Sequence, residues 1–155
     1  MARRIEPSGI DYSAGVAAKR RADHAMENAE DYVELIDEMQ AQMGAAHVTD
    51  IAARLGVSTV TVHKTIKRLK LEGFVIAEPY RAIALTEQGR TLARESRIRH
   101  EVTLRFLRNL GLSEAEAQSD AEGIEHHVGA ELLEKMQRFS DTMEKRGEVR
   151  RADLG

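Results

Sequence analysis

The chain has 155 residues, 42% of them hydrophobic, which suffices for one compact unit or for two small units that share a core. It contains no cysteine, which excludes disulfides and thiolate sites, and only 4% aromatic residues, which favours a mainly helical fold with an aliphatic core. The net charge of −3 argues against simple electrostatic binding of nucleic acid, but no acidic residue lies between Asp50 and Glu72.

The sequence also bears on the compartment. No stretch approaches the roughly 18 consecutive apolar residues that a membrane span needs, and the N-terminus lacks an apolar signal core. The absence of cysteine removes thiolate ligands for any metal and is compatible with a reducing compartment. We therefore expect a soluble, cytoplasmic protein with no membrane partner.

The N-terminal segment predicts an arm followed by a helix. Residues 1–26 show little periodicity, so we expect a flexible arm. Its basic run Lys19-Arg20-Arg21 either contacts DNA phosphates or is simply solvated. From Ala25 to Met43 apolar residues recur at the spacing of one buried helical stripe, and Gly44 is typical of the residue after a helix.

Residues 47–72 predict a helix-turn-helix. Thr49 or Asp50 can cap a first short helix, Gly56 permits a tight turn, and Ser58 can cap a second helix. The outer side of that second helix carries hydroxyl and basic groups that suit base edges and phosphates: Ser58, Thr59, Thr61, His63, Lys64, Lys67 and Arg68. A helical pair that only stacks in a bundle is the alternative.

Residues 74–85 predict two short strands around a Pro79-Tyr80-Arg81 turn, which is the wing of a winged helix. Arg81 at the tip would contact a phosphate or the minor groove, with a solvated tip as the alternative. We therefore expect a winged-helix DNA-binding domain over residues 27–90 that binds double-stranded DNA.

The remaining sequence predicts three more helices. One begins at Thr86 and continues to Asn109, a second runs from Ser113, with a Ser113/Glu116 capping box, to about His127, and a last one runs from Glu131 to about Arg146. We assign residues 91–146 to a helical domain and residues 147–155 to a frayed tail.

Carboxylate and imidazole side chains occur in three stretches. Asp31 and Glu34 have i,i+3 spacing, and Glu122, Glu125 and His126 have i,i+3,i+4 spacing, so each set presents its heads on one helical face. Such groups repel one another unless a cation or protons compensate them, and the donor set favours Mn²⁺ or Fe²⁺ over Ca²⁺. A surface acidic patch with one core histidine is the alternative.

Catalysis is not favoured. Metalloprotease motifs need a histidine at position 122, which is Glu122, and no pair of Glu-x-x-His repeats suggests a di-iron bundle. No glycine-rich phosphate loop, nucleophile elbow or Ser/His/Asp arrangement is visible. We therefore expect a protein that is not an enzyme and that holds no organic cofactor.

Several motifs, in this order, resemble the manganese transport regulators, a branch of the diphtheria-toxin-repressor family of metal-dependent transcription factors. The resemblance runs from about Asn28 to Phe139. The motifs that carry it are Asp31-Tyr-Val-Glu34, the helix-turn-helix, Tyr80-Arg-Ala-Ile-Ala-Leu-Thr86, Arg99-His100-Glu101 and Asp120-Ala-Glu-Gly-Ile-Glu-His-His127.

The resemblance implies a homodimer with a C-terminal helical dimerisation region, which binds palindromic operators and represses manganese uptake genes when loaded with Mn²⁺. It places a binuclear site, with two ions per subunit, on six residues: Asp31, Glu34, His100, Glu122, Glu125 and His126. Iron-sensing relatives have softer sulfur residues at two of these positions, so the carboxylates support manganese. An Fe²⁺-responsive regulator of this family and a metal-independent winged-helix regulator remain as alternatives.

Overall fold

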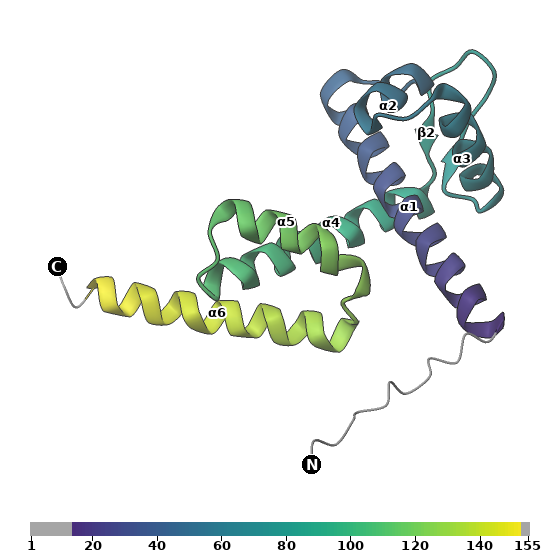
Figure 1. Ribbon diagram of the computed structural model, residues 1–155. Coiled ribbons are helices and arrows are strands. Elements are labelled where there is room, and N and C mark those ends of the chain that lie inside the picture. The colour runs from purple at the N-terminus through teal and green to yellow at the C-terminus, as the bar shows by residue number, and fades with distance from the viewer. Residues whose placement is uncertain (1–13, 153–155) are drawn as a thin grey trace.

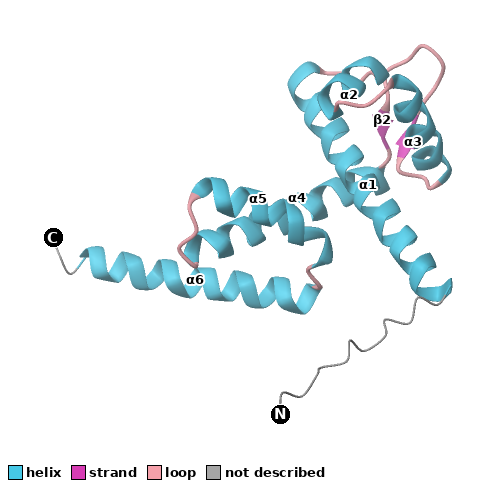
Figure 2. Ribbon diagram, viewed as in Figure 1, coloured by secondary structure: helices cyan, strands magenta, loops and turns pink. Residues whose placement is uncertain are grey.

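Figure 1 shows the computed structural model, which describes residues 14–152. It is mainly helical, with one small hairpin (Figure 2). The elements are α1 (Ala14–Met43), α2 (Val48–Leu55), α3 (Thr59–Leu71), β1 (Val75–Ile76), β2 (Ala84–Leu85), α4 (Glu87–Asn109), α5 (Glu114–Ile124), the 3₁₀ helix η1 (Glu125–His127) and α6 (Ala130–Ala152). No helix in this described range is both long and apolar enough to cross a membrane.

The helix-turn-helix is present as predicted. Gly56 ends α2 in the left-handed conformation, with φ 65°, and the Ser58 hydroxyl accepts a hydrogen bond from the Thr61 backbone N–H at the start of α3. The predicted cap of α2 is wrong, because the N-cap residue is His47, whose side chain makes no capping hydrogen bond. The short α2 is instead held by the burial of its apolar face in the core.

The wing is also present. β1 and β2 pair antiparallel, with Val75 opposite Leu85, and an isolated bridge joins Ile83 to Ala46, just after α1. Tyr80 at the turn has φ 62°, an uncommon conformation for a residue other than glycine, and its side chain is fully exposed. The hairpin is thus anchored at its base to the α1–α2 connection, while its tip projects into solvent.

One aliphatic core lies between α1, α2, α3, the wing and the start of α4. A second, smaller cluster around Leu107, Ala117 and Ala121 holds α5 against the end of α4. Helix α4 therefore belongs to both units, and Figure 1 shows it leading from the winged helix to the α5–α6 region. Any side chain near the middle of α4 lies at the junction of the two.

Three helix limits differ from the prediction. α1 begins at Ala14 rather than near Ala25, so that only residues 1–13 of the expected arm lie outside the described residues. α5 ends at Ile124 and is followed by η1, whereas a continuous helix to His127 was expected. α6 extends to Ala152, beyond the expected end at Arg146, and only residues 153–155 of the expected tail are not described.

Gly89, in the first turn of α4, allows the helix to approach the wing closely. A Cβ atom at this position would lie 2.1 Å from the Phe74 carbonyl oxygen. We expect Gly89→Ala to lower the free energy of unfolding by about 1–3 kcal/mol, the usual cost of overpacking, in urea denaturation. Gly147→Ala in α6 is the control, because nothing lies within 4 Å of its added Cβ; it should leave stability unchanged or raise it. Equal stability of the two variants would contradict this account of the wing–α4 contact.

Candidate metal centre

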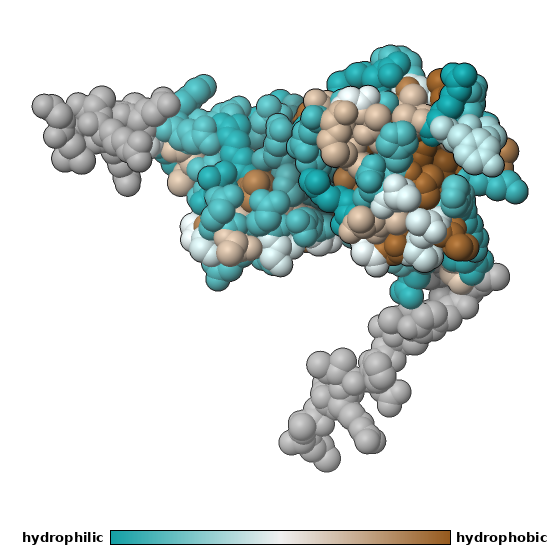
Figure 3. Space-filling view, turned by 90° about the horizontal axis from the view of Figure 1, so that it is seen from above, coloured by the Kyte–Doolittle hydropathy of each residue, from teal (hydrophilic) through white to brown (hydrophobic). Residues whose placement is uncertain are grey.

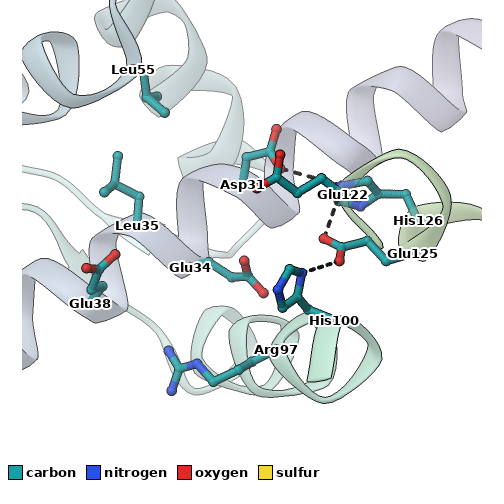
Figure 4. Close-up of a pocket in the computed structure, with 10 residues that line it drawn as sticks. All are labelled: Asp31, Glu34, Leu35, Glu38, Leu55, Arg97, His100, Glu122, Glu125 and His126. Atoms are coloured by element: carbon teal, nitrogen blue, oxygen red, sulfur yellow. Dashed lines mark hydrogen bonds and ion pairs between the residues drawn. The ribbon is translucent and has the colours of Figure 1, made fainter. Parts of the chain in front are cut away.

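The six residues that the resemblance implies as ligands line one cavity of about 540 Å³ between the two units (Figure 4). Asp31 and Glu34 come from α1, His100 comes from α4, Glu122 comes from α5, and Glu125 and His126 come from η1. The cavity is also lined by residues that were not predicted as ligands: Leu35, Glu38, Leu55 and Arg97. Residues from distant parts of the sequence are thus brought together.

His100 makes two polar contacts in this cavity. Its Nδ1 atom lies 2.5 Å from Glu125 Oε2, and its Nε2 atom lies 3.1 Å from Gln118 Nε2. A carboxylate oxygen accepts and an amide nitrogen donates, so the imidazole donates from Nδ1 and accepts at Nε2. Glu125 is buried, with 5% of its surface exposed, and this hydrogen bond partly compensates the burial of its carboxylate.

The two acids of α1 lie in surroundings that disfavour their charged forms. Burial raises the pKa of Asp31; the nearby His126 opposes this shift, and the carboxylates Glu30 and Glu125 add to it. Burial also raises the pKa of Glu34, against a lowering effect of the Ser96 hydroxyl. Glu34 Oε1 and Ser96 Oγ are nevertheless buried without a hydrogen bond of standard geometry in the described structure.

His126 is held between carboxylates. Its Nδ1 atom lies 2.7 Å from Glu30 Oε2, and its Nε2 atom lies 3.7 Å from both Asp31 Oδ1 and Glu125 Oε1. Burial lowers the pKa of this imidazole, but the hydrogen bond to Glu30 and the surrounding carboxylates raise it by more, so that the net shift is upward. The carboxylates around the His126 ring therefore favour a positive charge on the imidazole.

The break between α5 and η1 changes the predicted geometry. Glu122, Glu125 and His126 do not share one face of a single α-helix, because the last two lie in the 3₁₀ turn. Glu122 is exposed, whereas Glu125 is buried. All three still line the same cavity, so the turn takes the place of the expected helical face in aiming them.

The donor set suits a divalent cation. It consists of carboxylate oxygens and imidazole nitrogens, and Glu34 Oε1 is a buried acceptor that makes no hydrogen bond of standard geometry among the described residues. With the side chains as they stand, no three acidic or histidine residues of the described range converge closely enough to enclose an ion. The His100–Glu125 and His126–Glu30 hydrogen bonds hold both rings beside carboxylates instead.

Glu30, Arg99 and Gln118 were missed as contributors to this region. Glu30 lies three residues before Val33 on the buried stripe of α1, and an acid on such a stripe requires a polar partner, so a signal was available. Arg99 provides that partner from α4. Gln118 carries no comparable signal in the sequence.

The predicted DNA-contacting residues fall into two groups. Six side chains of α3 and its cap are exposed: Ser58, Thr59, Thr61, His63, Lys64 and Lys67. Arg68 instead turns towards α1, where its guanidinium donates to the Ala25 carbonyl oxygen at 3.0 Å and to Asn28 Oδ1 at 2.9 Å. We therefore assign Arg68 to the packing of α3 on α1 rather than to the outer face.

A groove runs between α3 and the wing, lined among others by His63, Lys67, Lys70 and Arg81. Arg81 is exposed and lies 3.2 Å from the Glu78 carboxylate, also on the wing. The groove thus has cationic side chains on both of its walls, Lys67 and Lys70 on α3 and Arg81 on the wing.

Seen from above, the winged-helix side carries brown, apolar patches among polar ones, whereas the α5–α6 side is largely teal (Figure 3).

Comparisons with known proteins cover both units. Residues 24–83 match the family model of the iron dependent repressor N-terminal DNA binding domain, and residues 86–149 match that of the iron dependent repressor metal binding and dimerisation domain. The transcriptional regulator MntR of Salmonella typhimurium is 47% identical over 120 residues, which cover 77% of this chain and 76% of the relative. The HTH-type transcriptional regulator MntR of Lysinibacillus sphaericus is 34% identical over 120 residues, 77% of this chain and 86% of the relative.

Solved structures agree with this grouping. A manganese-dependent transcriptional repressor in complex with manganese has a TM-score of 0.65 at 30% identity, and the manganese regulator SloR has a TM-score of 0.64 at 29% identity. Each match covers 73% of this chain, which spans about half the length of those longer chains, 52% and 53%. The two family models together account for most of the sequence, and the chain belongs to the iron dependent repressor family of transcriptional regulators.

Proposed function

We propose that the chain is a Mn²⁺-responsive transcriptional repressor that binds a palindromic operator as a homodimer and controls manganese uptake genes. The observation that carries this proposal is the cavity in which oxygen and nitrogen donors of α1 face those of α4, α5 and η1. Relatives named MntR and the manganese-bound neighbour support the choice of ion. Carboxylates at Asp31 and Glu122, in place of softer sulfur ligands, favour Mn²⁺ over Fe²⁺.

The proposed mechanism uses the position of the cavity. Asp31 and Glu34 belong to the winged helix, whereas Glu122, Glu125 and His126 belong to the helical unit. The four carboxylates among the proposed ligands repel one another, and two bound divalent cations per subunit would supply the compensating charge. To convert a rare operator-competent arrangement into the dominant one takes about 5.5 kcal/mol of differential binding, a demand that several ligands per ion can meet.

The same proposal includes a cytoplasmic location and the absence of catalysis. A repressor acts on double-stranded DNA, and the exposed hydroxyl and lysine side chains of α3 suit base edges and phosphates. The cavity residues are explained by metal binding, which requires neither a substrate nor an organic cofactor.

We also propose that α6 contributes to the contact with a second copy. Leu132, Phe139 and Met143 follow one helical stripe, at spacings of seven and four residues, and are 49%, 37% and 38% exposed. We expect the native chain to sediment as a dimer and the variant Leu132→Asp/Met143→Asp to sediment as a monomer, because buried carboxylates oppose an apolar interface. A variant that remains dimeric would place the interface elsewhere.

The metal centre is tested by Glu125→Gln. We expect the affinity for Mn²⁺ in calorimetry to fall at least tenfold, and Mn²⁺-dependent operator binding in fluorescence anisotropy to fall with it, because a buried anionic ligand is lost. Glu38→Gln is the matched control: Glu38 lines the same cavity but bonds to Arg54 at 2.9 Å and is not a proposed ligand. Operator binding by the metal-free chain as tight as by the loaded chain would favour a metal-independent regulator. Titration with Fe²⁺ in parallel decides between the two ions.

The DNA face is tested by comparing adjacent residues of α3. Lys67→Ala should weaken operator binding about equally for all sequences and reduce the slope of log affinity against log salt by about one, without a change in stability. Arg68→Ala should leave that slope unchanged but lower the free energy of unfolding by about 1–2 kcal/mol, because it removes two hydrogen bonds to α1. If the two variants exchanged these effects, the assignment of the outer face would be wrong.

A further inference from the structure

Glu30 is a buried acid next to a proposed ligand, yet it is not one of the six. It lies on α1 with 7% of its surface exposed, and each of its carboxylate oxygens has a partner from another element. Oε1 accepts from the Arg99 guanidinium of α4, and Oε2 accepts from His126 Nδ1 of η1 at 2.7 Å. A buried carboxylate is costly unless it is paired in this way. Three elements of the cavity wall therefore meet at Glu30.

The hydrogen bond to Glu30 determines how the His126 ring is presented. An ionised carboxylate can only accept, so Nδ1 must carry the proton of this bond. In the neutral ring the lone pair is then on Nε2, the atom that faces Asp31 Oδ1 and Glu125 Oε1. Both separations are 3.7 Å, beyond hydrogen-bond length, so neither carboxylate engages Nε2 directly.

Arg99 binds the other oxygen of the same carboxylate. Its side chain is 19% exposed, and it reaches Glu30 from the residue next to His100, itself a proposed ligand. The guanidinium compensates the charge of Glu30 and occupies the oxygen that His126 leaves free. Both Glu30 oxygens are therefore engaged by side chains, and neither is free for a cation.

We propose that Glu30 and Arg99 are positioning residues of the metal centre, which fix the His126 ring so that Nε2 faces the cavity. The inference rests on the proposed function, because it concerns a ligand of that same site. Hydrogen-bonded carboxylates commonly hold metal-ligating histidines in this way, and their loss typically costs 10–100-fold in metal affinity. The link spans α1, α4 and η1, so Glu30 and Arg99, which are not proposed ligands, also connect the winged helix to the helical unit.

The test compares Glu30→Gln with Asp37→Asn. Both changes neutralise an acid of α1 that pairs with an arginine of α4, since Asp37 Oδ2 lies 2.9 Å from Arg97, but Asp37 touches no proposed ligand. We expect Mn²⁺ affinity, measured by the loss of the free-ion resonance in electron paramagnetic resonance, to fall 10–100-fold in Glu30→Gln and to stay within twofold of native in Asp37→Asn.

A second readout does not depend on the metal. In ¹⁵N imidazole spectra of the metal-free chain, at a pH at which the ring is neutral, His126 of the native chain should carry its proton on Nδ1. Glu30→Gln should shift the ring towards the Nε2–H tautomer, whereas Asp37→Asn should not. If Glu30→Gln fails to fold by circular dichroism, Arg99→Gln tests the same link from α4 and should show the same two changes in weaker form.

The outcomes separate the two proposals. If Glu30→Gln keeps both the native tautomer and native Mn²⁺ affinity while Glu125→Gln loses affinity, the positioning role is overturned and the metal centre stands. If Glu125→Gln also binds Mn²⁺ as the native chain does, the proposed function itself fails. An equal loss of affinity in Asp37→Asn and Glu30→Gln would overturn the positioning role, since it would show that any weakening of the α1–α4 contact has this effect.

Discussion

The packing of α4 against α1 is the constraint on which both halves of the molecule depend. The first turn of α4 lies against the wing through Gly89, its middle pairs with α1 through Arg97 and Arg99, and its end holds α5 in the second apolar cluster. Since α1 also forms one side of the winged-helix core, a shift of one helix along the other would alter the core and the cavity together. The cavity lies where two domains are already joined by ion pairs.

This arrangement refines the proposed mechanism, in which bound metal favours one arrangement of the two units. The α1–α4 contact is held by arginine–carboxylate pairs, which need no metal. The proposed ligands on η1 and α5 face that contact from the helical unit, and the carboxylates of Asp31 and Glu34 lie where burial opposes their charge. The uncompensated carboxylate charge therefore lies where η1 and α5 face α1, rather than where α4 crosses α1.

Local signals made much of the fold predictable. Helix ends are determined by interactions within a few residues, and the structure contains the predicted ones at Gly56, at Ser58 and at the Ser113/Glu116 capping box. The start of α1 was not found, because residues 14–26 lack an apolar stripe, although alanine, lysine and arginine are good helix formers. Helical periodicity located Arg68 on α3, but its partners Ala25 and Asn28 lie about forty residues earlier, beyond any local pattern.

The resemblance predicts which residues hold the metal, and that ligand set stays a prediction; the local geometry differs from the one that helical spacing predicts. The resemblance supplied the six positions, and the structure gathers them around one cavity, whereas helical spacing wrongly assigned Glu125 and His126 to a continuous α-helix. That assignment failed because tertiary contacts, His100 with Glu125 and Glu30 with His126, outweigh the local preference for one more helical turn. The position of Glu30 on the buried stripe indicates that it needs a polar partner, but the sequence does not show that Arg99 and His126 provide it.

The 3₁₀ turn has a consequence for how fast the protein can respond. Its closing backbone hydrogen bond, from Val128 N–H to the Glu125 carbonyl, is 3.3 Å long, and the turn is only three residues in length. Such turns have poorer hydrogen-bond geometry than α-helices, so opening η1 costs less free energy than opening α5 or α6. A sensor must release its ion as well as bind it. Glu125 and His126, two of the proposed ligands, stand on this three-residue turn rather than on α5 or α6, so they can release the ion without unfolding either helix.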